Sequence, residues 1–278
     1  MKTLIPRVLV SLCLAAPFPL LAQNYVDLDF SNHTQATNGS GDLGPHYTGP
    51  VMNFTNVAAA SGKNIDLVAS VSATSGNYSF VATYPDYSSA VKQPDGDLGF
   101  VYQANGYGIG GITYTLDFYQ GGGSFTDSLA INNFRLMMYD VDGESWQSES
   151  VRVYVADGFY GYQLPTVGGI TVTDEGNGSF LFTGPGVNRA ETDPSAAFIL
   201  YFRNTSSINL EMVADTYERV GRQKGPLPNQ VFSAIDGDLS MLNGDMSSFG
   251  NITLVPVPEP SSLILGLLSA LPLLRRRR

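Results

Sequence analysis

The acidic residues that follow one apolar stretch are the clearest candidates for chemistry in this chain. Asp140, Asp142 and Glu144 lie around Gly143, and Glu149 follows a few residues later. A strand that ends in Asp-x-Asp-Gly directs two carboxylates to the same side, and the glycine permits a sharp turn that brings backbone carbonyls beside them. Because Ca²⁺ takes roughly six to eight oxygen ligands, this segment predicts a calcium site built from Asp140, Asp142 and Glu149.

A plain turn is the alternative for the same segment. The EF-hand pattern is not met, because the glycine comes too early and Val151 stands where that loop requires its last acid. Aspartates in turns often accept backbone N–H bonds and need no metal for this. Two Asp-Gly-Asp sequences, at 95–97 and 236–238, have similar local chemistry, and each is predicted to be a β-turn.

No recognisable catalytic motif accompanies these acids. Glycosidases act with two carboxylates about 5–10 Å apart, a distance that a sequence does not supply. His33 and His46 are predicted to be loop residues, since Asp42 is the one acid between them and a zinc site requires further ligands. Residues 106–111 have the glycine content of a phosphate-binding loop without its lysine. We therefore predict a protein without enzymatic activity.

The single tryptophan, Trp146, lies in the polar stretch next to these acids. An exposed aromatic ring on a loop can stack on a sugar ring, and a partly buried ring can anchor the loop. The sequence leaves both roles open.

The elements that position these residues are predicted to be strands. Apolar and polar residues alternate with period two along most of the chain, and turn residues recur between the alternating runs. Asn177-Gly178 lies between two such runs, and its residues tolerate positive φ, which indicates a hairpin. Residues 23–254 are therefore predicted to form one antiparallel β-sandwich, jelly-roll-like in its topology. Strands are expected at 25–30, 51–57, 65–71, 78–84, 98–103, 112–119, 134–141, 150–156, 161–164, 170–173, 179–183, 196–202, 208–213 and 231–235.

The N-terminus has the layout of a secretory signal peptide. Lys2 and Arg7 precede an apolar stretch at 8–21, and Ala22 is followed by polar residues. Residues 1–22 are therefore predicted to direct export through the Sec machinery and to be removed after Ala22. The only cysteine, Cys13, lies in this segment, so the mature chain would contain no disulfide and no thiolate site.

The exported part of the chain is strongly acidic. Residues 23–258 contain 24 acidic and nine basic residues, a net charge of −15 against −10 for the whole chain. Such a surface repels nucleic acid, which is excluded as a partner.

The C-terminus combines three elements in a fixed order. Pro258, Glu259 and Pro260 are followed by an uncharged apolar segment at 263–274 and then by Arg275, Arg276, Arg277 and Arg278. The prolines hold the chain extended, the apolar segment prefers lipid to water, and the arginines resist crossing a membrane. A buried helix or an ordinary tail anchor would be the alternatives, but a core helix does not usually end in four arginines.

This order resembles the PEP-CTERM sorting signal of Gram-negative bacteria, over residues 255–278. The resemblance implies recognition and processing at Pro258, Glu259 and Pro260 by a membrane-embedded exosortase. It also implies a transient stay in the inner membrane, a final location at the cell surface or outside the cell, and a structural or adhesive role in a polysaccharide or biofilm matrix.

Two internal segments carry a second resemblance. Residues 54–57 with 65–68, and residues 134–143 with 149–151, resemble the bacterial surface modules called choice-of-anchor domains. This implies a β-sandwich displayed on a cell surface and implies no reaction. A secreted carbohydrate-binding or carbohydrate-active protein with the same sorting signal is the alternative function.

Overall fold

The computed structural model describes residues 24–41, 44–60, 62–87, 96–190, 193–217, 226–242 and 245–256. Strands dominate these residues, and the helical elements among them are four 3₁₀ turns of three residues each. No helix in this part of the chain is long and apolar enough to cross a membrane. The predicted signal peptide and residues 258–278 of the predicted sorting signal lie outside the described residues.

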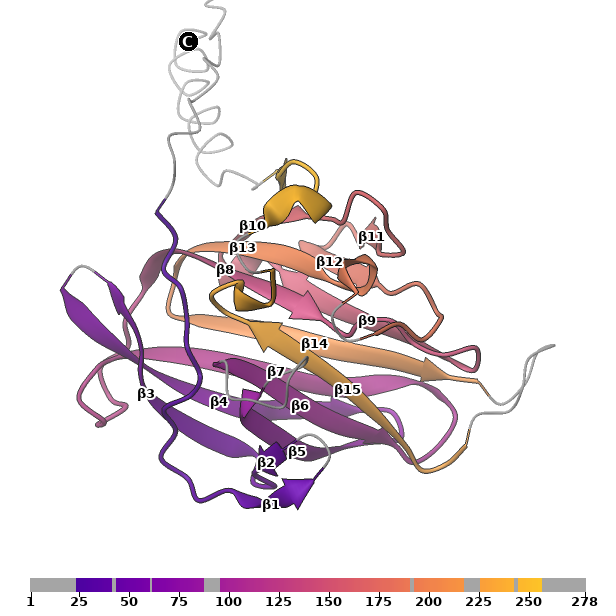
Figure 1. Cartoon of the computed structure of the whole chain (residues 1–278), viewed down its shortest axis with the longest axis horizontal. Coiled ribbons are helices and arrows are strands. Elements are labelled where there is room, and N and C mark those ends of the chain that lie inside the picture. The colour runs from indigo at the N-terminus through magenta and orange to yellow at the C-terminus, as the bar shows by residue number, and fades with distance from the viewer. Residues whose placement is uncertain are drawn as a thin grey trace, which may run out of the picture.

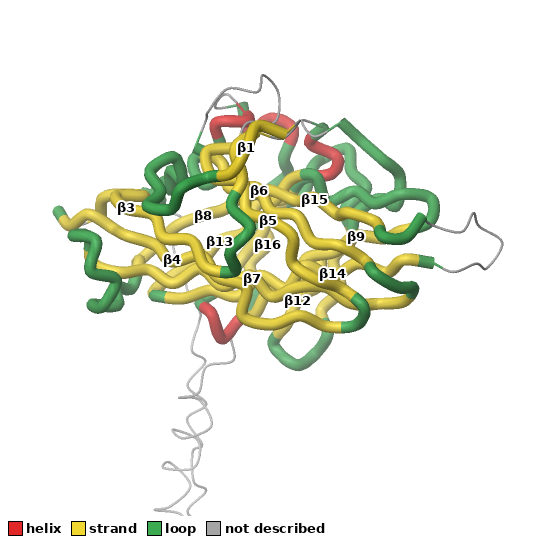
Figure 2. Tube along the Cα trace, turned by 90° about the horizontal axis from the view of Figure 1, so that it is seen from below, coloured by secondary structure: helices red, strands yellow, loops and turns green. Residues whose placement is uncertain are grey.

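Two seven-stranded antiparallel sheets form the body of the molecule (Figures 1 and 2). Sheet A has, in spatial order, β16 (Thr253–Leu254), β10 (Phe159–Gln163), β13 (Phe198–Thr205), β8 (Ile131–Tyr139), β15 (Asn229–Asp236), β6 (Asp97–Ala104) and β5 (Tyr78–Tyr87). Sheet B has β11 (Thr171–Asp174), β12 (Ser179–Thr183), β9 (Gln147–Tyr154), β14 (Ser207–Thr216), β7 (Gly108–Gln120), β4 (Lys63–Ser75) and β3 (Val51–Ala60). A small ladder joins β1 (Asn38–Gly41) to β2 (Gly44–His46).

The predicted all-β sandwich is confirmed. From β6 to β11 every connection carries the chain from one sheet to the other, which is the alternation typical of jelly rolls. The period-two pattern in the sequence has a structural cause, which is visible in β14. Buried residues alternate with half-buried ones along the whole of this strand. One face of this strand therefore packs into the core while the other is left near solvent.

Aromatic rings fill the space between the sheets. Phe182 of sheet B stacks on Phe198 of sheet A, with ring centroids 4.5 Å apart. Within sheet A, Phe134 stacks on Phe202 at 5.2 Å. Such pairs stabilise a core by about 0.5–1.5 kcal/mol each beyond the apolar area that they bury.

Sheet A is covered on both faces. Met137, Tyr139 and Tyr201 point away from the main core, yet each has at most 2% of its surface exposed. They belong to a second apolar cluster that includes Leu239 and Phe249, from the segment containing the turns Ser240–Leu242 and Met246–Ser248. This cover explains why β8 and β13 contain continuous apolar runs instead of alternating ones.

The predicted strand at 25–30 is wrong as a member of a ladder. Leu28 donates its N–H to the carbonyl of Gly237, and Phe30 donates to the carbonyl of Gly96. Asp29 donates to Val57, in sheet B. The segment therefore crosses between the sheets, and the alternation in its sequence arises because Leu28 and Phe30 are buried.

The hairpin predicted at Asn177-Gly178 is present between β11 and β12, but its turn differs from the prediction. The residues with positive φ are Gly176 (74°) and Gly178 (85°), whereas Asn177 is not among them. The side chain of Asn177 instead accepts the N–H of Ser179 at 3.0 Å.

The glycine-rich stretch at 106–111, which lacks the lysine of a phosphate-binding loop, is mostly strand, because β7 begins at Gly108. At Gly111, an added Cβ would lie 1.7 Å from the carbonyl oxygen of Met212 on β14. Glycine is required there because two backbones approach each other closely.

Candidate functional site

The loop predicted to bind calcium is a tight hairpin. Glu144 and Gln147 exchange backbone hydrogen bonds of 2.8 and 3.1 Å, which places Ser145 and Trp146 at its tip. Gly143 has φ of 80°, as the sequence predicted for a sharp turn at this position. Trp146 is half-buried, and its carbonyl accepts the N–H of Tyr217 at 2.9 Å.

Two of the three predicted ligands are largely buried. Asp142 has 6% of its surface exposed and Glu149 has 7%. The carboxylate of Asp142 accepts the N–H of Arg189, and its carbonyl accepts the N–H of Gly186 at 2.7 Å. Asp142 thus attaches the 184–190 segment to the hairpin, a structural role close to the alternative of a hydrogen-bonded turn.

Glu149 belongs to a buried polar network that links the two sheets. Its carboxyl accepts a hydrogen bond of 2.9 Å from the side chain of Gln147. The amide oxygen of Gln147 accepts from Thr216 on β14 and from Asn229 on β15, at 3.2 and 2.6 Å. Thr216 also lies 2.8 Å from the hydroxyl of Tyr78 on β5.

Burial raises the pKa of Glu149 to about 8, and the neighbouring charge of Asp142 adds to the effect. Burial also raises the pKa of Asp142. The folded protein therefore holds a proton on Glu149 at neutral pH. The network surrounds a neutral carboxylic acid, and Glu149 would release its proton on binding calcium.

A different set of acids has the spacing of a cation site. In the part of the chain that the structure describes, one group of acidic or metal-binding side chains has ligand atoms all within 4.8 Å of one another: Asp97, Asp236 and Asp238. These come from the two Asp-Gly-Asp sequences, which lie far apart in the sequence. Antiparallel pairing of β6 with β15, where Leu98 faces Ile235, brings them together. Asp95 lies outside the described residues.

Asp236 is buried and strongly hydrogen-bonded. Its Oδ1 accepts the N–H of Asp238 at 3.0 Å, and its Oδ2 accepts that of Met241 at 2.9 Å. Burial raises the pKa of Asp236, although the N–H of Met241 acts in the opposite direction. Tyr139 donates to Asp97 at 2.7 Å. At the predicted β-turn the chain bends at Gly237 and Asp238, and the side chain of Asp236 organises the residues that lead to the cover of sheet A.

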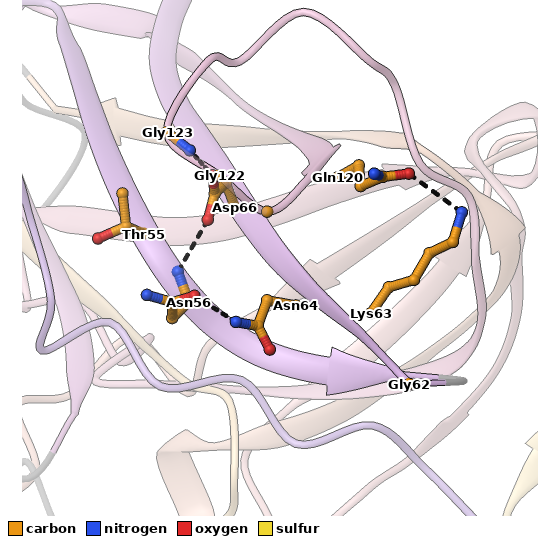
Figure 3. Close-up of a pocket in the computed structure, with 10 residues that line it drawn as sticks. Thr55, Asn56, Gly62, Lys63, Asn64, Asp66, Gln120, Gly122 and Gly123 are labelled. Atoms are coloured by element: carbon orange, nitrogen blue, oxygen red, sulfur yellow. Dashed lines mark hydrogen bonds between the residues drawn. The ribbon is translucent and has the colours of Figure 1, made fainter.

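An open cavity of about 600 Å³ lies at the end of β3, β4 and β7 (Figure 3). Its lining is polar, and Asn56, Lys63, Asn64 and Gln120 contribute side chains to it. Gly62 and residues 121–123 form glycine segments around it. The β3–β4 hairpin that carries most of this lining projects from the body at the left of Figure 1.

Asp66 connects two of the segments that line this cavity. It is fully buried, its Oδ1 accepts the N–H of Asn56 at 2.9 Å, and its Oδ2 accepts the N–H of Gly123 at 2.7 Å. Asn56 has φ of 55° at a bulge in the β3–β4 pairing. Asp66 therefore joins the bulged strand to the glycine loop after β7, and two of the residues that carried the second resemblance prove to be neighbours.

A second cavity, of about 770 Å³, shares Lys63 with the first. Asn24, Asn132, Asn133 and Asp27 are among the residues that line it. Sequence reasoning missed both cavities. The sequence pattern that accompanies these cavities is a cluster of Asn, Gln and Gly near strand ends. The same pattern is common in plain turns, so it does not by itself predict a cavity.

The histidines do not meet. His33 donates a 2.9 Å hydrogen bond from Nδ1 to the carbonyl of Gln35, and its ring contacts Phe54. His46 ends the short strand β2, so its prediction as a loop residue is wrong, and its ring packs 5.4 Å from that of Tyr84.

Comparison with known proteins gives little guidance. A scan against protein-family models found no matching family, and a search of curated proteins found no match. Among solved structures, the N-terminal domain of the Streptococcus gordonii adhesin Sgo0707 is similar, with a TM-score of 0.43 and 10% identity over 70% of this chain. The similarity spans 48% of that structure, so this chain covers about half of its length. A similarity of this size establishes neither a shared fold nor a shared function.

Proposed function

We propose that this chain is exported through the Sec machinery, held transiently in the inner membrane, and released to the cell surface or the extracellular matrix by an exosortase. The observation that carries the proposal is the C-terminal order of Pro258-Glu259-Pro260, an apolar segment at 263–274 and Arg275–Arg278. The apolar segment is shorter than the roughly 20 residues of a membrane-spanning helix, which suits a temporary anchor. The arginines keep the last residues on the cytoplasmic side.

The sandwich has properties that suit a role outside the cell. Its two sheets are held by a core that needs no disulfide, since Cys13 lies in the predicted signal peptide. Residues from the N-terminal segment cover one edge of each sheet, through Thr34 on β3 and Tyr47 on β5. Covered edges and a strongly acidic composition both oppose aggregation. Such a body can serve as a structural or adhesive component of a polysaccharide matrix.

The proposed role does not include catalysis. A general acid must reach its substrate, and neither Glu149 nor Asp142 lines the two cavities described above. A secreted carbohydrate-active enzyme is the competing function. Incubating the released protein with polysaccharides and measuring new reducing ends separates the two. Release that disappears when one carboxylate is replaced would establish an enzyme.

Intact-mass measurement of the surface-released protein tests the export pathway. The expected mass corresponds to a chain that starts near Gln23 and lacks the segment from about Pro258 onward. Glu259→Ala is expected to prevent processing while Sec export continues, and replacing Arg275–Arg278 by serine is expected to disturb retention. Released wild-type protein that still contains residues 263–278 would show that the segment is a simple tail anchor.

A further inference from the structure

We infer that the two cavities that share Lys63 at the end of the β3–β4 hairpin form a binding site for a neutral polysaccharide chain. We call this site the amide groove and define it by Asn56, Lys63, Asn64, Gln120 and the adjoining Asn24, Asn132 and Asn133. The inference rests on the proposed role in a polysaccharide matrix, and it assigns the contact to one end of the sandwich and to one class of glycan.

The side chains of the amide groove match a ligand made of hydroxyl groups. A sugar hydroxyl both donates and accepts hydrogen bonds, and a carboxamide offers two donors and an acceptor in one plane. Six residues with amide side chains line the two cavities: Asn24, Asn56, Asn64, Gln120, Asn132 and Asn133. An apolar ligand would leave these amides without partners, which costs free energy for each group removed from water.

Two internal hydrogen bonds orient the groove before any ligand arrives. The Asn64 amide donates to the Asn56 amide oxygen at 2.8 Å, and Lys63 donates to Gln120 at 3.0 Å (Figure 3). Within the described residues, the amide nitrogen of Asn56 and the amide oxygen of Asn64 make no further hydrogen bond. They remain available to a ligand, while their orientation is already fixed, which lowers the entropy lost on binding.

The charges near the groove favour a neutral glycan over an acidic one. Among the residues that the structure describes, Lys63 is the one cation that lines either cavity. The carboxylate of Asp66 accepts two backbone N–H groups, and Asp27 lies 3.8 Å from Arg135. The exported chain around this nearly balanced groove has a net charge of −15, so it repels a polyanion at longer range.

The shape suits a chain of sugars more than a single one. The two cavities, of about 600 and 770 Å³, share Lys63, which lies next to the turn of the β3–β4 hairpin. A Cβ added at Gly62 or Gly122 would meet no atom within 4 Å, so the rim presents backbone without side chains. A polymer can therefore enter and leave the groove along its length.

Binding of the full chain to soluble polysaccharides tests the inference. The protein is kept in a non-ionic detergent that has no sugar head group and is titrated with dextran, laminarin and galactomannan, with alginate as the acidic comparison. We expect at least one neutral polysaccharide to bind more tightly than alginate. The double variant Lys63→Met/Asn64→Ala should weaken that binding by about tenfold or more, because it removes a charged donor and an amide.

Asn105→Ala is the matched control. On the surface, the side chain of Asn105 accepts a hydrogen bond from Gln103 and donates one to Ser79, but Asn105 does not line the groove. This variant should bind as the wild type does. The inference is overturned if no neutral polysaccharide binds, if alginate binds at least as tightly, or if the double variant binds like the control. Because processing at Glu259 is measured by mass, failure here is distinguishable from failure of the export proposal.

Discussion

Replacing Glu149 by glutamine is expected to make the protein more stable at alkaline pH. Burial raises the pKa of this carboxyl from 4.5 to about 8 in the folded state, so the folded protein retains a proton that the unfolded chain releases. The stability associated with that proton is fully present below about pH 4.5 and is lost as pH rises through about 8. Glutamine keeps a polar group beside Gln147 and has no proton to lose.

The difference in pKa sets the size of the effect. At about 1.36 kcal/mol for each unit of pKa, the change from 4.5 to about 8 corresponds to at most about 5 kcal/mol between acid and alkaline pH. The total free energy of unfolding of a protein is only about 5–15 kcal/mol, so even half of this amount is readily measured. The tyrosines Tyr78 and Tyr102 face the same carboxylate, and its charge adds to the burial that raises the pKa of each.

Urea denaturation at a series of pH values from 5 to 9 measures this prediction. The wild type should lose free energy of unfolding toward pH 9, and Glu149→Gln should lose much less. Glu175→Gln is the matched control and should lower the free energy of unfolding across this pH range. Hydrogen bonds from Arg152 lower the pKa of Glu175, so its ionised form stabilises the fold. Parallel pH profiles for the wild type and Glu149→Gln would refute the conclusion that Glu149 is protonated at neutral pH.

Two further predictions concern calcium and Asp66. Millimolar calcium is expected to raise the melting temperature relative to chelator, by the equivalent of about 2.7 kcal/mol once the free ion reaches 100 times its dissociation constant. Differential scanning fluorimetry measures this response in two double variants that remove equal formal charge, Asp140→Asn/Asp142→Asn and Asp236→Asn/Asp238→Asn. The variant that abolishes the response identifies the site of the ion. A wild-type melting temperature that calcium leaves unchanged would contradict calcium binding. Asp66→Ala is expected to lower the free energy of unfolding by about 2–4 kcal/mol, because it leaves the N–H groups of Asn56 and Gly123 without their acceptor. A urea midpoint equal to that of the wild type would contradict this role.

The fold class could be predicted because alternation is a local property of the sequence. In β14 and β9, each strand buries one face, and the period-two pattern reports this directly. The same rule failed at 25–30, where Leu28 and Phe30 are both buried in the core although the backbone is hydrogen-bonded to residues next to sheet A and, through Asp29, to β3 of sheet B. An alternating pattern shows that one side of a segment is buried, but it does not identify the neighbouring strands that accept its hydrogen bonds.

The candidate site was less predictable because it depends on the order of strands in the sheets. The acidic group at Asp97, Asp236 and Asp238 exists because β6 and β15 are neighbours, and no local rule predicts that pairing. The sequence did identify the sharp turn at Gly143, and a bend is present at the second Asp-Gly-Asp sequence. It could not show that Glu149 would be buried and protonated, since burial of a β9 residue depends on β14 and on the 184–190 segment.

Unequal strand lengths explain why polar cavities gather at one end of an otherwise apolar sandwich. In sheet B, β4 and β7 have 13 residues each, whereas the longest strand of sheet A has 10. Ile65 pairs with Gln120 at the end of this ladder, so Lys63 and Asn64 lie beyond the last paired residues of β7. Lys63 and Asn64 are exposed at this end of β4, so apolar residues in their place would be exposed to water. Asparagine, glutamine and glycine are suited to such a position, and the same composition suits contact with a hydroxyl-rich polymer.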